Sequence, residues 1–424
     1  METGDSRTLQ ELAALDRRLV SAAKPIRLLA SVSWSSTTQA DFLRRRWRAG
    51  GVQLPEPDYV RLDYSGTRDE IEAVQAAAHT YGDHPVADYI WRTAESLDVS
   101  TQLLDALGTA AVTEHSIRLF GKPGDVLPGS ELHNIEAAQH FISLADELSH
   151  ELSTQEADYC LSAEVLQREL QEKINSFFVF HQVRVELDPK LMAKAAAGPT
   201  RIRLRSGTAF SEYDRHQLLE HEAFVHSLTA LNGREQPHLK SLALNSPRIT
   251  ATQEGLATFA ELITGSIDIG RMKRISMRII AIDMALRGAD FIEVFRYFLD
   301  SGQTDTDSFT SAQRVFRGVP LTGGSAFTKD TVYLHGLLSV HTFFRWALKN
   351  SRLKLIRHLF AGKLTLHDVI ALEPYFDSGW LKPALYLPHW VTRANGLAGM
   401  LAFSLFANRI RLEKVQEDDL VLGL

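Results

Sequence analysis

Residues 221–226 read His-Glu-Ala-Phe-Val-His, so two histidines flank an acidic residue within one short segment. Histidine nitrogens bind zinc, and a glutamate beside a bound metal can act as general base towards water. The segment therefore predicts a metal centre in which His221 and His226 are ligands and Glu222 is the base. Because the chain has 16 histidines, the same motif could also consist of two ordinary helix residues.

The spacing of the two histidines makes a second prediction. Ser211 with Asp214 three positions later is typical of a helix start, and Asn232-Gly233 is typical of a helix end. The histidines are five positions apart, whereas the usual H-E-x-x-H motif places them four apart. Five residues of a regular α-helix turn by roughly 140°, too far for two imidazoles to reach one ion. We therefore predict an extra residue in this helix, as in a π-bulge.

A catalytic zinc needs a third protein ligand and keeps one position open. Residues 250–261 predict a second helix, which ends near Gly265, and Glu254 lies close to its start. Gly255 costs about 1 kcal/mol relative to alanine inside a helix, so it indicates close packing of another backbone. Glu261 lies seven residues after Glu254 on about the same face. It is either a partner of a ligating histidine or the third ligand itself.

These roles together predict hydrolysis of an amide bond. The metal would lower the pKa of a water molecule and polarise the scissile carbonyl. Glu222 would take a proton from the water and pass it to the leaving amine. The alternating segment Arg201–Arg205 predicts a strand that could pair with an extended peptide substrate.

Composition narrows the class of protein. The chain has 424 residues, 45% of them hydrophobic, and a formal net charge of -6, which favours a globular protein that binds neither nucleic acid nor anionic lipid. The single cysteine, Cys160, excludes an internal disulfide and a cysteine-rich zinc site. The N-terminus lacks the apolar region of a secretory signal, and the apolar run from Gly396 to Ala407 is too short to span a bilayer. We therefore expect a cytoplasmic protein.

Periodicity predicts a mostly helical α+β fold. Helical spacing dominates residues 1–175, with leucines at positions 9, 12, 15 and 19. Segments Phe177–Phe180 and Val183–Val185 are rich in β-forming residues, and helices resume at Ser211. We predict a helical N-terminal region (residues 1–175) packed on a catalytic domain (residues 176–424) with a small sheet.

The two motifs His221–His226 and Gln253-Glu254-Gly255-Leu256-Ala257 resemble the flavohemoglobin expression-modulating QEGLA-motif proteins. The eukaryotic relatives of that family include the microtubule-associated tyrosine carboxypeptidases. Further similar segments follow in the same order along nearly the whole chain: Ala23–Arg27, Leu54-Pro55, Ser206–Ser211, Leu231–Arg234, Arg314, Arg317-Gly318, Phe327–Asp330 and Tyr333-Leu334.

The resemblance implies a zincin-like peptidase with one Zn²⁺ per chain. It implies that His221, His226 and Glu254 are the ligands and Glu222 is the base, which favours Glu254 over Glu261 as the third ligand. In the eukaryotic relatives the activity is removal of a C-terminal aromatic residue from tubulin. This sequence looks like the bacterial branch, for which tubulin is not an expected substrate.

A carboxypeptidase also needs cations for the terminal carboxylate of its substrate, a peptide or a protein C-terminus. Our candidates are Arg314, Arg317 and Lys329, with Tyr333 as a donor to the tetrahedral oxyanion. Each of these residues could instead be an ordinary solvated or core residue. Two alternatives stay open: an endopeptidase or aminopeptidase, and a non-enzymatic regulatory protein with a structural or vestigial metal site. The sequence does not indicate an oligomeric state, or which divalent metal is bound.

Overall fold

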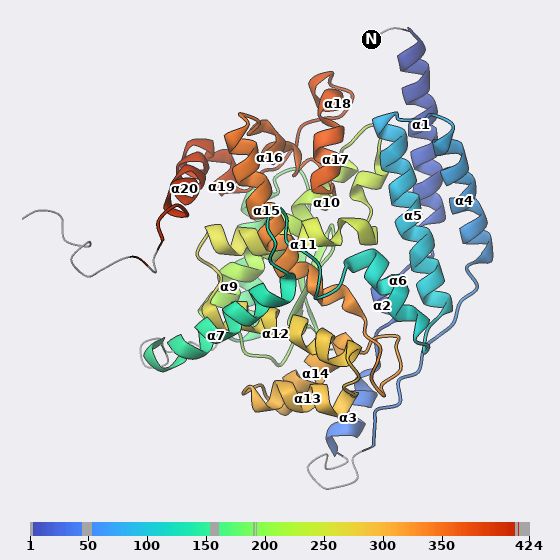
Figure 1. The fold of residues 1–424 in the computed structure, drawn as a ribbon. Helices are drawn as coiled ribbons and strands as arrows, with labels where there is room; N and C mark the ends of the chain where they lie inside the picture. Colours follow the sequence, from blue (N-terminus) through green and yellow to red (C-terminus); the bar gives the residue numbers. More distant parts are fainter. Residues whose placement is uncertain are drawn as a thin grey trace, which may run out of the picture.

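The structure is a computed structural model that describes residues 3–44, 53–152, 161–189, 191, 193–411 and 414. It is mostly helical with one small sheet, as the sequence predicted (Figure 1). The helices of the first part of the chain are α1 (Thr3–Ala22), α2 (Leu28–Ser31), α3 (Ser36–Arg44), α4 (Ser65–His79), α5 (Pro85–Asp105), α6 (Ala111–Phe120), α7 (Asn134–Leu152) and α8 (Ala163–Phe177).

The second part of the chain carries the sheet and the remaining helices. The segments that matter for the site are α9 (Glu212–Leu218), η1 (Leu219–Ser227), α10 (Leu228–Arg234), α11 (Thr250–Ile263), α12 (Ile269–Leu286), α14 (Asp305–Val315), η4 (Thr328–Thr331) and α15 (Val332–Lys349). The others are η2 (Lys240–Ala243), η3 (Pro247–Ile249), α13 (Phe291–Asp300), α16 (Lys354–His358), α17 (Leu366–Ala371), α18 (Glu373–Asp377), α19 (His389–Thr392) and α20 (Ala394–Ala407). No helix in the described ranges is long and apolar enough to cross a membrane.

The sheet has three short strands in the order β1-β3-β2. Strand β1 (Arg184–Asp188) runs parallel to β3 (Arg201–Arg205), and β2 (Ala195–Ala197) runs antiparallel to it. The alternation in β3 is real, since Ile202 and Leu204 are buried between more exposed arginines. The prediction of a strand at Phe177–Phe180 was wrong, because α8 extends to Phe177 and the ring of that residue packs against Phe224.

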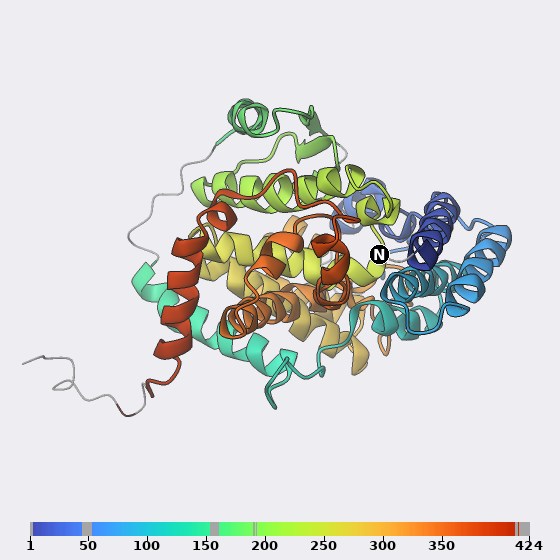
Figure 2. The same ribbon diagram turned by 90° about the horizontal axis from the view of Figure 1, so that it is seen from above.

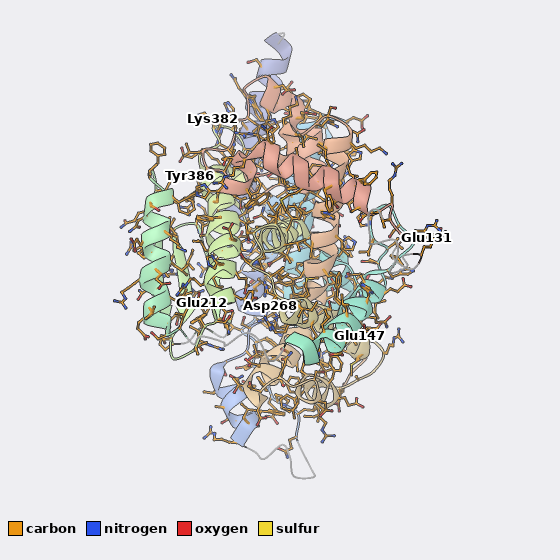
Figure 3. The ribbon with its side chains drawn as sticks, turned by 90° about the vertical axis from the view of Figure 1, so that its left-hand side faces the viewer. Glu131, Glu147, Glu212, Asp268, Lys382 and Tyr386 are labelled. Carbon is orange, nitrogen blue, oxygen red and sulfur yellow. The ribbon has the colours of Figure 1, made fainter. Side chains whose placement is uncertain are left out.

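The α9–η1–α10 segment forms one long helix between two layers (Figure 2). The sheet and α8 lie on one side of it, and α11, α12 and α15 lie on the other. The bundle of α1, α4 and α5 stands beside these layers. Figure 3 shows α8 and the long helix side by side from another direction, with Glu212 near one end of this pair of helices and Tyr386 near the other.

Two hydrophobic clusters form the core. The larger one joins residues of the first helices, such as Leu9 and Ile90, to residues of the last ones, such as Leu397. The smaller one packs Trp34 and Phe42 against Phe291 and its neighbours on α13 and α14. Packing of this kind holds the long helix in the middle of the molecule. The predicted boundary near residue 175 stays a prediction.

Candidate metal centre

The helix that carries both histidines is π-helical where the sequence predicted an extra residue. Ser211 caps its start, with a reciprocal pair of hydrogen bonds to Asp214. The π-helical part, η1, then covers Leu219–Ser227 and so includes the whole His-Glu-Ala-Phe-Val-His segment. Because π-helical hydrogen bonds join residues five apart, the two histidines come to the same face. Their rings lie 4.8 Å apart, centroid to centroid.

Three side chains converge in front of this face: His221, His226 and Glu254, which we call the metal triad. One nitrogen or oxygen atom from each lies within 4.8 Å of the others. Glu254 Oε2 is 3.5 Å from His221 Nε2 and 3.6 Å from His226 Nε2. Zinc ligands bound tetrahedrally at about 2.0–2.2 Å lie about 3.3–3.6 Å apart, so the carboxylate and the imidazoles fit such an ion.

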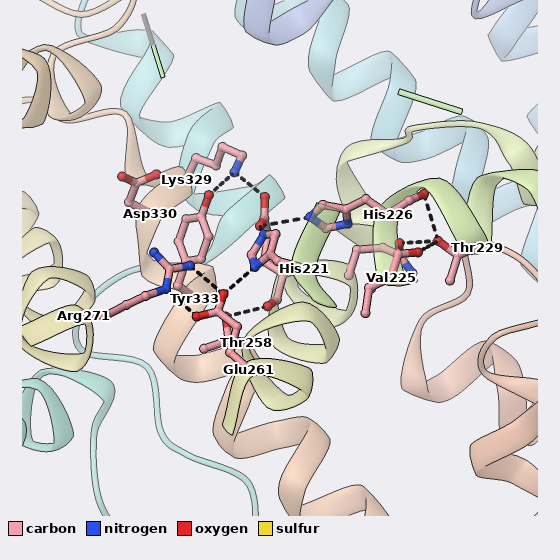
Figure 4. Close-up of polar contacts among 12 residues, drawn as sticks. His221, Val225, His226, Thr229, Thr258, Glu261, Arg271, Lys329, Asp330 and Tyr333 are labelled. Carbon is pink, nitrogen blue, oxygen red and sulfur yellow. Dashed lines mark hydrogen bonds and ion pairs between the residues drawn. The ribbon is translucent and has the colours of Figure 1, made fainter. Parts of the chain in front are cut away.

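Glu261 holds His221 from behind (Figure 4). His221 Nδ1 donates a 2.6 Å hydrogen bond to Glu261 Oε1, which leaves Nε2 to face the other ligands. Arg271 on α12 donates in turn to both oxygens of Glu261, one of them at 2.7 Å. A carboxylate in this position fixes the tautomer and orientation of a ligating histidine. Of its two predicted roles, Glu261 therefore has the geometry of a supporting partner.

The electrostatics of the triad favour a cation. Burial opposes ionisation of Glu254, but the charge of Lys329 and the two histidines hold its pKa well below the usual range. Burial also opposes protonation of His221, yet Glu254 and Glu261 raise its pKa to about 10. The same negative field that favours a proton on His221 favours a metal ion at that place.

Gly255 has the close packing that its helical position predicted. A Cβ atom built there would lie 2.2 Å from the carbonyl carbon of Gly336 on α15. A Cβ on Gly336 would lie 2.2 Å from the backbone oxygen of Ala251. The two glycines therefore let α11 and α15 touch backbone to backbone, which places Glu254 next to the residues at the start of α15.

The predicted substrate residue Lys329 lies directly beside the triad, and the predicted oxyanion donor Tyr333 lies beside Lys329. Lys329 is buried, and its Nζ donates a 2.9 Å hydrogen bond to Glu254 Oε1. Tyr333 follows one turn later, with its hydroxyl 3.4 Å from Lys329 Nζ. The structure thus gives Lys329 the position of a counter-ion for Glu254, and not that of a free cation for substrate.

Arg314 and Arg317 lie farther from the triad. Arg314 makes two hydrogen bonds to Asp330, of 2.5 and 2.7 Å, and a third of 3.4 Å to the hydroxyl of Tyr333. The Nε atom of Arg317 is buried and has no hydrogen-bond partner among the described residues. Arg278, which the sequence analysis missed, lies with its Nε 3.7 Å from Asp330 Oδ2. We call Arg278, Arg314 and Arg317 the arginine cluster.

Lys363 was also missed. Its side chain is 6% exposed, and the structure shows no hydrogen bond or ion pair for its Nζ within the described ranges. The charges of Glu254 and Glu222 act on it, although burial has the larger effect and lowers its pKa to about 8. Glu222 itself is half-buried beside His221. No motif in the sequence pointed to Lys363, because the glutamates whose charges act on it lie 109 or more positions away along the chain.

The strand predicted to pair with a peptide is not available. β3 is the central strand and already has β1 on one side and β2 on the other. A pocket of about 400 Å³ runs along this sheet and is lined by residues such as Arg184, Ala196 and Arg203, not by the triad. An extended peptide beside η1 would therefore have to pair with β2, whose neighbour Gly198 accepts a hydrogen bond from Ser227.

Comparison with protein families decides the relationship. The family model for microtubule-associated tyrosine carboxypeptidases matches residues 41–409, which is most of the chain. This chain belongs to that family. The match includes all of the triad, Glu222 and the arginine cluster. A comparison with curated proteins found no match. Membership in the tyrosine carboxypeptidase family suggests a carboxypeptidase-like enzyme, in agreement with the resemblance seen in the sequence.

Proposed function

We propose that the chain is a zinc-dependent carboxypeptidase with a zincin-like site that removes a residue from the C-terminus of a peptide or protein. The observation that carries this proposal is the convergence of two histidines and one glutamate on a π-helix and its neighbour, in a chain of the tyrosine carboxypeptidase family. His221, His226 and Glu254 would hold one ion. A bound Zn²⁺ there would act as a Lewis acid towards water and the scissile carbonyl.

The roles of the protein side chains follow from their positions. Glu222, which directly follows His221 in the π-helix and is half-buried, would accept a proton from water and then deliver it to the leaving amine. Glu261 and Arg271 would keep His221 in one tautomer and orientation. The Tyr333 hydroxyl, which lies beside Lys329 and Arg314, would donate a hydrogen bond to the developing oxyanion.

The first test is metal content together with peptide hydrolysis. We expect about one zinc ion per chain in the protein purified without added metal, and a sharp loss of zinc in Glu254→Ala. We expect cleavage of the last residue from a library of peptides with free C-termini. Glu222→Gln keeps the shape of the side chain but removes the base, so it should lower kcat by about 10²–10⁴-fold while zinc stays bound.

Glu212→Gln is a matched control, because Glu212 lies on the same long helix and pairs with the exposed side of Arg215. It should keep both zinc and activity. Equal activity in Glu222→Gln and the parent would refute the assigned base. Bound zinc without cleavage of any peptide would favour the alternative, a regulatory protein with a structural metal site.

A further inference from the structure

The arginine cluster carries more positive charge than its surroundings balance. The cluster brings together three guanidinium groups: Arg278 on α12, Arg314 on α14 and Arg317, two residues after the end of α14. Two of them, Arg278 and Arg314, share the carboxylate of Asp330. Arg314 takes both oxygens of that carboxylate, and Arg278 reaches it only at 3.7 Å. Arg317 has no acidic partner within 4 Å among the described residues, and its buried Nε has no hydrogen-bond acceptor.

Burial makes this excess costly. Burial and, after it, the charge of Arg314 lower the pKa of Arg278 and of Arg317 to about 10 each. Asp330 opposes this effect but cannot neutralise three cations. Buried charges are normally paired, so two under-compensated guanidinium groups in one place indicate a site for an anion that the protein itself does not supply.

The cluster lies within reach of the metal triad. The hydroxyl of Tyr333 is 3.4 Å from Arg314 on one side and 3.4 Å from Lys329 Nζ on the other. Lys329 Nζ is 2.9 Å from the triad residue Glu254. Figure 4 shows Lys329, Asp330 and Tyr333 together on the side of His221 that is opposite Thr229. Since an extended chain advances about 3.3–3.6 Å per residue, the last one or two residues of a peptide can bridge this distance.

We propose that Arg278 and Arg317 bind the terminal carboxylate of the substrate, while Asp330 holds Arg314 as a fixed wall of the same site. This inference rests on the proposed function and deepens it. It replaces two of the cations predicted from sequence, since Lys329 is bonded to Glu254 and Arg314 to Asp330. The planar fork of arginine suits a carboxylate, and a carboxylate fixed there restricts the enzyme to the ends of chains.

The experiment measures binding rather than turnover. The full-length Glu222→Gln protein, loaded with zinc, is exposed to two libraries of hexapeptides that vary at the last two positions. One library has free C-termini and the other is C-terminally amidated. We expect the free-acid peptides to be retained about 10–100-fold more strongly, in keeping with charge-assisted hydrogen bonds. Arg278→Gln and Arg317→Gln, added to Glu222→Gln, should each reduce this preference to a few-fold, and Arg278→Lys should keep part of it.

Arg274→Gln is the control, because Arg274 lies one turn earlier on α12 and its side chain is about half exposed. It should leave the preference unchanged. Equal retention of the two libraries by the parent would overturn the proposal, as would no retention of the free-acid library or an unchanged preference in both glutamine variants. The parent comparison keeps the test valid even where an arginine variant fails to fold.

Failure of this site and failure of the proposed function give different results. A free-acid preference that depends on Arg278 and Arg317, without hydrolysis by the wild-type protein, would support the carboxylate site and refute the peptidase. Hydrolysis of free and amidated peptides at equal rates would support a peptidase and refute the carboxylate site.

Discussion

Among Glu254, Glu261, Lys329 and Arg271 at the metal centre, each buried charge lies beside one of opposite sign. Glu254 faces two histidines and Lys329, and Glu261 lies between His221 and Arg271. In the arginine cluster, which Tyr333 and Lys329 connect to the triad, two guanidinium groups share Asp330. The third, Arg317, has no acidic partner within 4 Å among the described residues. The charges of the first region fit the cation that we propose there. The surplus positive charge of the second fits the carboxylate that we propose there. The contrast teaches that the balance of charge distinguishes the proposed metal site from the proposed carboxylate site, although both are largely buried.

The largest expected effect comes from removing the charge of Asp330, the one acid that pairs with the arginine cluster among the described residues. Asp330→Asn should destabilise the protein at pH 7 by about 3–5 kcal/mol, because it leaves Arg314 and Arg278 without a counter-charge. Urea unfolding measures this. Asp377→Asn is the control, since Asp377 pairs with Lys354 at an exposed site and should cost under about 1 kcal/mol. An equal effect of the two variants would contradict the contrast between the regions.

The stability of the protein at low pH should also depend on Asp330. Burial opposes ionisation of Asp330, but Arg314 and Arg278 hold its pKa well below the usual range. A depressed pKa stabilises the folded state fully above the unfolded value of about 3.9, and the gain is lost as pH falls below it. Stability of the parent should therefore fall between about pH 4 and pH 2 more steeply than that of Asp330→Asn. Parallel curves for the two proteins would be incompatible with this role.

The backbone contact between α11, which carries Glu254, and α15, which carries Tyr333, should also be sensitive to substitution. Gly255→Ala would put a methyl group 2.2 Å from the backbone of Gly336 and force α11 away from α15. We expect a loss of about 1–3 kcal/mol or more in stability, measured by thermal unfolding. Gly66→Ala on α4 is the control, because a Cβ there meets no atom within 4 Å. Retention of full stability by Gly255→Ala would mean that the two helices can separate freely.

In the metal triad, loss of the supporting residue Glu261 should weaken zinc binding without abolishing it. Glu261→Gln keeps the hydrogen bond acceptor for His221 Nδ1 but removes the charge that Arg271 and the histidine share. We expect zinc affinity to fall about 10–100-fold, measured by competition with a chromogenic chelator. Glu212→Gln should leave it unchanged. A complete loss of zinc, equal to that of Glu254→Ala, would instead make Glu261 a ligand.

An effect of the opposite sign is expected at Lys363, on which the charges of Glu254 and Glu222 act without a direct bond. Burial lowers its pKa to about 8, so its charge destabilises the folded state below that pH. Lys363→Met should be more stable than the parent by about 1–3 kcal/mol at pH 7, and this gain should shrink as pH rises from 8 towards 10. Lys382→Met, at an exposed lysine, should show no such pH dependence. Lower stability of Lys363→Met at pH 7 would contradict the assignment.

The sequence predicted what depends on local spacing. The five-residue interval between the histidines required a π-helix, and Gly255 required a close backbone contact. The helical spacing predicted for residues 1–175 is found in α1, α4, α5 and α7, and the leucines at positions 9, 12, 15 and 19 lie on α1. The relation of Glu261 to His221 could only be narrowed to two roles, because it depends on a contact 40 positions away along the chain.

Other features could not be predicted because they arise only in the folded chain. Lys329 pairs with Glu254, which lies 75 positions away along the chain, and no periodic pattern in the sequence predicts such a contact. Arg278 lies on a helix that also carries Arg271, which is bonded to Glu261, and the half-exposed Arg274, so its position in the sequence does not distinguish it. The aromatic run at Phe177–Phe180 was mistaken for a strand because aromatic residues are common in strands. Here they lie at the end of helix α8, and the local composition does not distinguish the two cases.

The π-helix has a consequence for how this chain can evolve. Beyond it, Asn232 binds the backbone oxygens of Phe360 and Tyr386, and Gln236 binds those of Ala361 and Lys382. Deleting one residue between the histidines would restore the common four-residue interval but would turn everything after it by about 100°. These amides would then point away from the loops they anchor. The length of the motif and the contacts that hold the last quarter of the chain must therefore change together. A single deletion cannot convert this motif into the shorter one without losing those contacts.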